Sequence, residues 1–552
     1  MSRRSSVVRE TPVIGAKGNY AARLGLTAES FRQANSDNLK GDVSDHLQKQ
    51  LKPRHVHMIA IGGAVGTGLF VGTGGALASG GPGSVLLCFL VVGAMLFNVL
   101  YALGELSVMY PVVGGTYIYS SRFIDSAWGF AAGWNYMILW IMVLPLELTA
   151  AGLTMSYWDL DISVGVWITV FYFLIIFFST FGVWMYGEEE FWASIFKIAA
   201  VVVFIITGVV LNCGGGPRGS PYDSYVGGRY WREPGAFVNG FQGLSSVFAT
   251  AAFSFAGSEL VGLAAAETPN PRETIPRAIK QVFWRICIFY ITSLLLIGLL
   301  VPYNHPRLLG SYQTDISASP FVIALENGRL HGFPTFFNIV ILISVVSVGF
   351  TCVFAGSRTL TALAEQKYAP RAFKVIDRVG RPTWATIFCL SSGPIAYMNL
   401  SAKGAHVFNW ILSAAALSTL MTWASISIAH IRFRRAWKAQ GHSLDEIPFK
   451  AVFGVPGSYF ALVIILVAMF AQAYTCLVPV NGVRDLRQFY ASFAEIPVFI
   501  VLFIGAKLWE RKRGGTWLAL KDVDLHSGRR LFSRDVRKKE QSWSRSVFDI
   551  LC

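Results

Sequence analysis

Charged residues are scarce in this sequence. Only 14% of the 552 residues are Asp, Glu, Lys or Arg, whereas 53% are hydrophobic and 14% are aromatic. A soluble globular protein carries about 25% charged residues. A deficit of this size excludes an ordinary soluble domain and indicates an all-α polytopic membrane protein whose main partner is the lipid bilayer.

Sequence signatures of catalysis are missing as well. The chain contains no phosphate-binding Gly-Lys-Ser/Thr loop, no nucleophile elbow and no histidine pair at metal-ligand spacing. Its seven cysteines form no C-x-x-C pair. We therefore expect no enzyme, no metal and no cofactor. Because an ATP-binding motif is also missing, any transport would depend on an ion or substrate gradient.

Long apolar runs fill most of the chain instead. About twelve stretches approach the ~20 residues that cross a bilayer as a helix. They define a transmembrane domain over residues 56–510, between an N-tail (1–55) that we expect to be largely disordered and a C-tail (511–552).

Basic residues predict the orientation of the chain. Lys and Arg concentrate in the two tails and in the loops on the same side as the tails, which predicts that both termini are cytoplasmic. The net charge of +15 therefore reflects topology. These residues are scattered rather than gathered on one face, so we expect no nucleic acid partner.

The first apolar stretch contains a run of glycines. Residues 62–75 (GGAVGTGLFVGTGG) include seven. Glycine weakens helices, and a broken backbone survives inside a membrane only where it lines a protein cavity. Small-residue packing between helices is the alternative explanation. Seven glycines exceed the needs of one packing face, so this stretch predicts a broken helix at a ligand site.

A second interruption is predicted in the sixth apolar stretch, at Phe253–Glu259 (FSFAGSE). Interrupted helices at matching positions of two five-span halves are typical of inverted-repeat transporters. The first break offers free N–H groups at the start of its second half-helix, where Gly66, Thr67 and Gly68 would bind a carboxylate.

The break in the sixth stretch offers free carbonyls from Phe253, Ser254, Phe255 and Ala256, which suit an ammonium group. Together the two breaks predict a zwitterion, an α-amino acid, as the ligand. Core packing is the alternative role for either phenylalanine, and we expect Phe253 rather than Phe255 to be the gate over the ligand.

Ionisable residues inside the apolar stretches are functional candidates because each is costly to place in a membrane. Lys197 is the only basic residue deep in any stretch. It is either a structural ion-pair partner of a buried glutamate or a cation that takes part in proton coupling. Glu147 has the same two interpretations, and for Glu105 we favour the structural one.

These motifs together resemble the fungal amino acid permeases of the amino acid–polyamine–organocation superfamily. The resemblance covers about residues 48–515. Beyond the two breaks, it depends on Leu69-Phe70, Gly104-Glu105-Leu106, Tyr110-Pro111, Gly114-Gly115, Tyr186-Gly187-Glu188, Phe191-Trp192-Ala193, Lys197, Ala266-Glu267-Thr268-Pro269-Asn270-Pro271-Arg272, Ser357-Arg358, Ala362, Ala364 and Tyr368-Ala369-Pro370.

The resemblance implies a fold of the leucine-transporter type with about twelve helices and a five-plus-five inverted repeat. Helices 1 and 6 are broken, repeat one covers about 56–211, repeat two about 241–433, and two extra helices follow at about 457–510. It implies proton-coupled import of amino acids at the plasma membrane, with H⁺ as the coupling ion.

The same resemblance makes Lys197 the favoured coupling residue and places Glu147 near the substrate. It also implies ubiquitin-ligase adaptors as partners of tail lysines, for which Lys17, Lys40 and Lys49 are available.

We therefore predict a plasma-membrane amino acid/H⁺ symporter of broad specificity. Two alternatives stay open: a vacuolar exporter or antiporter of the same fold, and a nutrient receptor (transceptor) that senses substrate without net transport.

Overall fold

The computed structural model describes most of the chain between the two tails. The described residues are 30, 53–63, 65–111, 115–265, 271–310, 319–401, 404–478, 486–512, 518–527 and 529. Tail lysines Lys17, Lys40 and Lys49 lie outside them, as do Gly114 and the motif at 266–270. Within the described residues the elements are helices joined by turns and loops, which agrees with the predicted all-α class.

The first half of the domain begins with an interrupted helix. α3 ends at Gly62 and the helical backbone resumes at Gly68 in a short π-helix, so the glycine-rich stretch is broken as predicted. The elements of this half are α3 (Pro53–Gly62), η2 (Gly68–Gly72), α4 (Thr73–Met109), α5 (Tyr117–Phe123), α6 (Ser126–Thr154), η3 (Met155–Trp158), α7 (Val164–Ser179) and α8 (Val183–Asn212).

The first two predicted spans are joined by a sharp kink rather than a loop. α4 continues from η2 through Gly81, whose φ of 78° lies in the left-handed region, and then through Pro82. Glycine adopts this conformation without steric cost, and proline at the next position starts the second segment with a fixed φ.

The second half begins with the other interrupted helix. α9 ends at Ser254, residues 255–259 form turns, and α10 starts at Leu260. The elements are η4 (Trp231–Gly235), α9 (Gly240–Ser254), α10 (Leu260–Ala265), α11 (Pro271–Arg285), η5 (Ile286–Thr292), α12 (Ser293–Leu300), α13 (Pro306–Gly310), α14 (Pro320–Asn327), α15 (Phe333–Glu365), η6 (Arg371–Lys374), α16 (Thr383–Leu390), η7 (Gly393–Leu400) and α17 (Gly404–Ala439).

Further helices complete the described domain, namely η8 (Leu444–Glu446), α18 (Gly454–Leu477), α19 (Leu486–Phe493) and α20 (Glu495–Arg511). Among the described residues, seven helical segments are long and apolar enough to cross a membrane. One of these, Gly68–Met109, contains two predicted spans joined at the kink. Other predicted spans correspond to shorter or interrupted helices such as α9 and α10.

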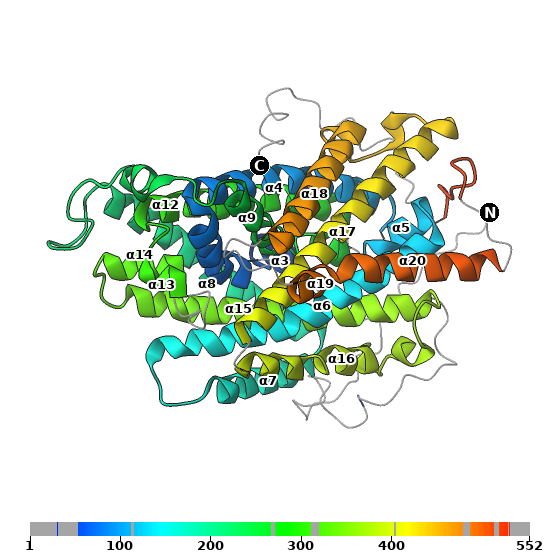
Figure 1. Ribbon diagram of the computed structural model, residues 1–552. Helices are drawn as coiled ribbons and strands as arrows, with labels where there is room; N and C mark the ends of the chain where they lie inside the picture. The colour runs from blue at the N-terminus through cyan, green and yellow to red at the C-terminus, as the bar shows by residue number, and fades with distance from the viewer. Residues whose placement is uncertain are drawn as a thin grey trace, which may run out of the picture.

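The long helices run side by side across the molecule (Figure 1). α6 packs along α15 and α17, α4 packs along α9, and the short helix α3 packs against α8. The two interrupted helices therefore lie inside the bundle, with α6, α8 and α15 as neighbours of the first break.

Part of the C-tail is attached to the end of this bundle where α4 and α17 end. Val523 and Leu525 are buried within residues 518–527, which we call the tail strap. Tyr110, at the end of α4, donates its hydroxyl to the carbonyl of Leu525 at 2.9 Å. Gln440, directly after α17, donates to the carbonyl of Val523 at 2.8 Å. This segment of the tail is therefore an ordered part of the fold.

Candidate functional site

The two broken helices meet at one point. A Cβ atom placed on Gly68 would lie 2.5 Å from the Cα of Ser254, so the backbone of the first break touches the backbone of the second. Two other glycines of the run are close to neighbouring helices in the same way. A Cβ on Gly62 would collide with Ser194 of α8, and one on Gly66 with Val348 of α15. Close packing therefore explains part of the glycine run.

A small buried cavity lies at this meeting point. Its volume is about 20 Å³, which is room for about one water molecule. The walls come from both breaks, from α6 and from α15, and consist of Gly63, Gly66, Thr67, Gly68, Leu139, Trp140, Val143, Glu147, Phe253, Ala256, Gly257, Val348 and Thr351. Ligand pockets usually measure about 300–1,000 Å³, so the walls must move apart to admit a ligand.

Most of the predicted substrate-binding residues line this cavity. Gly66, Thr67, Gly68, Phe253 and Ala256 are all in its walls. The remaining two, Ser254 and Phe255, are not. The Ser254 hydroxyl donates to the carbonyl of Thr250 in its own helix at 2.7 Å. The Phe255 ring packs between Phe89 and Tyr290, at centroid distances of 5.6 and 4.6 Å.

Carbonyls of the second break are partly used within the protein. The Phe253 carbonyl accepts the N–H of Ala256 at 3.0 Å, and that of Phe255 accepts the N–H of Ser258 at 3.2 Å. The Ser254 carbonyl accepts the hydroxyl of Tyr290 at 2.9 Å. The Phe255 carbonyl also accepts the hydroxyl of Ser258 at 2.7 Å, which uses its second lone pair. Because each carbonyl has two lone pairs, the Ser254 carbonyl still has acceptor capacity for an ammonium group.

Glu147 lies directly on the first break. Its carboxylate accepts the hydroxyl of Thr67 at 2.6 Å, and both side chains are buried. The predicted carboxylate-binding group thus already holds a carboxylate of the protein. Both residues are candidates from the sequence, but their contact is seen only in the structure.

Lys197 lies on the α8 side of the same break. Its ammonium group donates to the carbonyl of Gly62, the last residue of α3, at 3.2 Å and pairs with Glu190 at 3.3 Å. Glu190 is fully buried and also accepts the hydroxyls of Ser194 and Ser347, at 2.9 and 2.7 Å. Lys197 is therefore an ion-pair partner that also holds the end of α3.

The other buried glutamates are in structural networks. Glu105 pairs with Arg434 at 2.5 Å and with His430 at 3.3 Å, and it accepts the backbone N–H of Ala451 at 2.7 Å. These contacts support the structural role that we expected. Glu259, beyond the second break, accepts the indole N–H of Trp423 at 3.1 Å.

Several residues at the site were not found by sequence reasoning. Trp140 and Val143 reach the cavity from α6, and Val348 and Thr351 reach it from α15. Their spacings of three residues match one helical face, but every buried helix shows such a face. Glu190 is another such residue, because it lies near the start of its apolar stretch and the sequence alone does not show that it pairs with Lys197.

The arrangement defines a class of protein. Two broken helices that face one buried cavity, inside a bundle whose described residues include seven membrane-capable helices, are the features of a multi-span membrane transporter.

Comparison with known proteins identifies the family. The family model described as amino acid permease matches residues 55–518. The amino-acid permease inda1 of Hypocrea atroviridis is 51% identical over 95% of this chain and 91% of its own length. The general amino-acid permease GAP1 of Saccharomyces cerevisiae is 46% identical over 91% and 83%, respectively.

The histidine permease of Saccharomyces cerevisiae is 42% identical over 94% of this chain and 87% of its own length. This chain belongs to the amino acid permease family, and the predicted resemblance is confirmed. Its relatives are permeases of amino acids, which makes this chain a multi-pass membrane protein of amino acid transport.

Proposed function

We propose that this protein imports amino acids across the plasma membrane together with protons, and that it accepts many different amino acids. Relatives named general amino-acid permeases support broad specificity. Basic residues concentrated in the tails and in the loops on their side support two cytoplasmic termini.

The cavity supports a specific pose for the substrate. The substrate carboxylate would bind at Gly66–Gly68, where the second half-helix begins and its dipole is positive. The α-ammonium group would bind the carbonyls of the second break. Phe253, which lines the cavity, would cover the substrate, and the side chain would extend toward Trp140 and Val348.

One contact carries the proposal of proton coupling, the hydrogen bond between Thr67 and Glu147. A substrate carboxylate at Thr67 would place a second negative charge beside Glu147 in a buried site. Two adjacent carboxylates cannot both stay ionised at low cost, so substrate binding favours the protonated form of Glu147. Proton uptake and substrate binding thereby become linked at one hydroxyl group.

Replacement of Glu147 tests this linkage. Glu147→Gln keeps an acceptor for the Thr67 hydroxyl but cannot ionise. In proteoliposomes loaded with unlabelled amino acids, we expect the variant to exchange a labelled mixture of the twenty L-amino acids within about threefold of the parent rate, because the cavity keeps its shape. Uphill accumulation driven by an inward proton gradient should fall at least tenfold.

Two outcomes would contradict the proposal. Accumulation by the parent protein that does not respond to the proton gradient would exclude proton coupling. Gradient-driven accumulation by Glu147→Gln at the parent level would remove Glu147 from it.

Cell-level measurements separate the alternatives. A tagged protein at the vacuolar membrane with export of amino acids would indicate the exporter. Binding of labelled amino acids without accumulation would indicate the receptor. Competition of uptake by each of the twenty amino acids in a permease-deficient yeast would measure specificity.

A further inference from the structure

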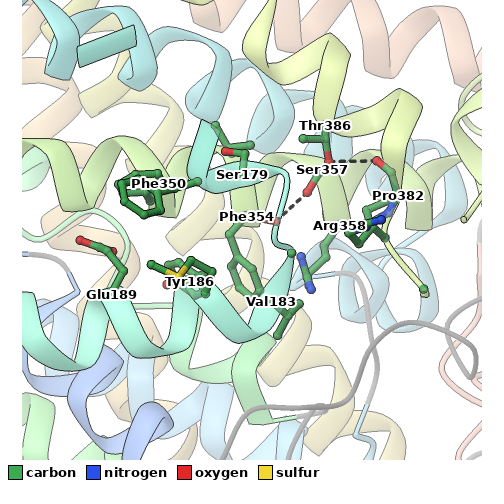
Figure 2. A pocket seen from close by; sticks show the side chains of 16 residues that line it. Ser179, Val183, Tyr186, Glu189, Phe350, Phe354, Ser357, Arg358, Pro382 and Thr386 are labelled. Carbon is green, nitrogen blue, oxygen red and sulfur yellow. Dashed lines mark hydrogen bonds between the residues drawn. The ribbon is translucent and has the colours of Figure 1, made fainter. Parts of the chain in front are cut away.

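A second cavity lies beside the substrate site, at the end of the bundle where α8 begins and α15 ends. It measures about 50 Å³, room for a few water molecules at ~10–15 Å³ each. Figure 2 shows Glu189 at one end of this cavity, and Arg358 and Pro382 toward the other. Its walls come from α7, α8 and α15 and from the segment 380–386. We call it the inner cavity.

An aromatic pair lies between the inner cavity and the substrate cavity. The Tyr186 and Phe354 rings are stacked, with centroids 4.1 Å apart and planes 17° apart (Figure 2). The Arg358 guanidinium lies over the Phe354 ring, with its Cζ atom 3.8 Å from the ring centroid. The Tyr186 hydroxyl lies 3.5 Å from that of Thr351, a wall residue of the substrate cavity.

Glu189 connects the inner cavity to the buried ion pair. The hydroxyl of Ser347, on α15, lies 2.7 Å from Glu190 Oε2 and 3.4 Å from Glu189 Oε2. Glu190 in turn pairs with Lys197 at 3.3 Å. A continuous chain of polar groups therefore runs from Lys197 through Glu190, Ser347 and Glu189 to the inner cavity.

The charges along this chain do not balance. Glu189 and Glu190 carry two negative charges when ionised, and Lys197 supplies one positive charge. Two carboxylates that share one hydroxyl favour the binding of one proton. Other charged groups lie farther along the cavity walls, with Arg358 against Phe354 and Arg381 paired with Asp377 at 2.6 Å.

Thr351, which lines the substrate cavity together with Glu147, lies 3.5 Å from Glu190 Oε2. We propose that Glu189 is the group through which the coupled proton, once it has passed from Glu147 to Glu190, leaves the Lys197–Glu190 pair for the cytoplasm. The inference deepens the proposed proton symport and depends on it. The proton of a protonated Glu190 passes to the Ser347 hydroxyl oxygen while the hydroxyl proton of Ser347 passes to Glu189. Glu189 then releases its proton to water in the inner cavity, so one proton enters the chain and one leaves it.

Glu189→Gln tests the proposal because glutamine cannot carry the proton. We expect gradient-driven accumulation of the labelled amino acid mixture in proteoliposomes to fall at least tenfold. Exchange against internal unlabelled amino acids should stay within about twofold of the parent rate, since exchange needs no net proton release and Glu189 does not line the substrate cavity.

Glu188→Gln is the matched control. Glu188 is the preceding residue of α8. Its carboxylate pairs with Arg54 at 2.5 Å and with His55 at 3.3 Å, so it is not part of the series of polar groups that runs from Lys197 to Glu189. This variant should accumulate substrate like the parent. Ser347→Ala should lose accumulation as Glu189→Gln does, whereas Ser347→Thr, which keeps the hydroxyl, should retain it.

The outcomes separate the two proposals. If the parent exchanges amino acids but does not respond to the proton gradient, the proposed symport fails. If the parent is coupled and Glu189→Gln accumulates substrate equally well, the role of Glu189 is excluded. Loss of exchange in both Glu189→Gln and Ser347→Ala would indicate a structural role and would also overturn the inference.

Discussion

At the scale of single residues, Lys197 has the first of the two roles that the sequence left open, that of an ion-pair partner, while its part in proton coupling stays a prediction. It forms a buried ion pair with Glu190, and it holds the carbonyl at the end of α3 beside the first break. A fixed cation at this point would stabilise α3 against α8 whenever Glu190 is ionised.

The variant Lys197→Met should abolish proton-driven accumulation of amino acids. Removal of the lysine alone also leaves the buried charge of Glu190 without its partner, and breaking such a pair costs about 3–5 kcal/mol. The double variant Lys197→Met/Glu190→Gln removes both charges and should recover most of the thermal stability of the purified protein.

Uptake at two external pH values and thermal unfolding in detergent separate the two effects. We expect the double variant to be stable but uncoupled. Active, pH-dependent uptake by a normally trafficked Lys197→Met protein would contradict the coupling role of this lysine.

At the scale of elements, the two breaks depend on close backbone contact. A Cβ on Gly68 would lie 2.5 Å from the Cα of Ser254, a distance at which one backbone must shift. The clash is steric and does not come from a strained φ at Gly68. Because the contact joins the two halves of the substrate site, the shift would displace the groups that bind carboxylate and ammonium relative to one another.

Gly68→Ala should therefore reduce uptake of the labelled amino acid mixture at least tenfold while surface expression stays near the parent level. Gly75→Ala is the matched control, because it lies farther along the same helix and a Cβ there meets no described atom within 4 Å. It should transport like the parent. Equal transport by both variants would mean that the breaks need not stay in contact.

The positions of the breaks could be predicted from the sequence because the residue types at a position, glycine above all, determine locally whether a helix continues. Seven glycines in residues 62–75 and the sequence at Phe253–Glu259 mark the two interruptions, and the structure has both.

Contacts between helices could not be predicted in the same way. Lys197 and Glu190 are seven residues apart on one helix, which places them on the same face two turns apart, but this spacing alone does not decide between Glu190 and a glutamate of a neighbouring helix such as Glu147. We expected Phe253 rather than Phe255 to cover the ligand, but the sequence did not predict what Phe255 contacts. In the structure Phe253 lines the cavity, whereas the Phe255 ring packs against Phe89 and Tyr290. Such outcomes depend on tertiary packing.

At the scale of the whole molecule, the tail strap links segments that are far apart in the sequence. It joins Tyr110 at the end of α4 to Gln440 at the end of α17, and Arg122 of α5 donates to the carbonyl of Asp524 at 2.8 Å. The cytoplasmic tail that we expect from the charge distribution is thus tied to both halves of the transport domain.

Within the strap, the Asp524 carboxylate organises the turn that follows it. It accepts the backbone N–H groups of His526 and Ser527, both at 2.9 Å, and lies 3.7 Å from Arg122. Hydrogen bonds from Ser527 are the main cause that lowers the pKa of Asp524 from 3.8 to about 2. A depressed pKa means that the folded strap is stabilised by the ionised form, and this stabilisation is present above pH 3.8 and is lost as the pH falls through about 2.

Asp524→Asn should consequently loosen the strap by a constant amount between pH 7 and pH 4. Amide hydrogen exchange of residues 518–527 in the purified full-length protein measures this, with faster exchange expected in the variant than in the parent. The difference between the two proteins should narrow only at about pH 3 and below, where the parent carboxylate begins to be protonated. Lys521→Ala, at an exposed strap position, is the control and should exchange like the parent. A difference that closes between pH 7 and pH 5 would show that another group, and not the Asp524 carboxylate, holds this turn.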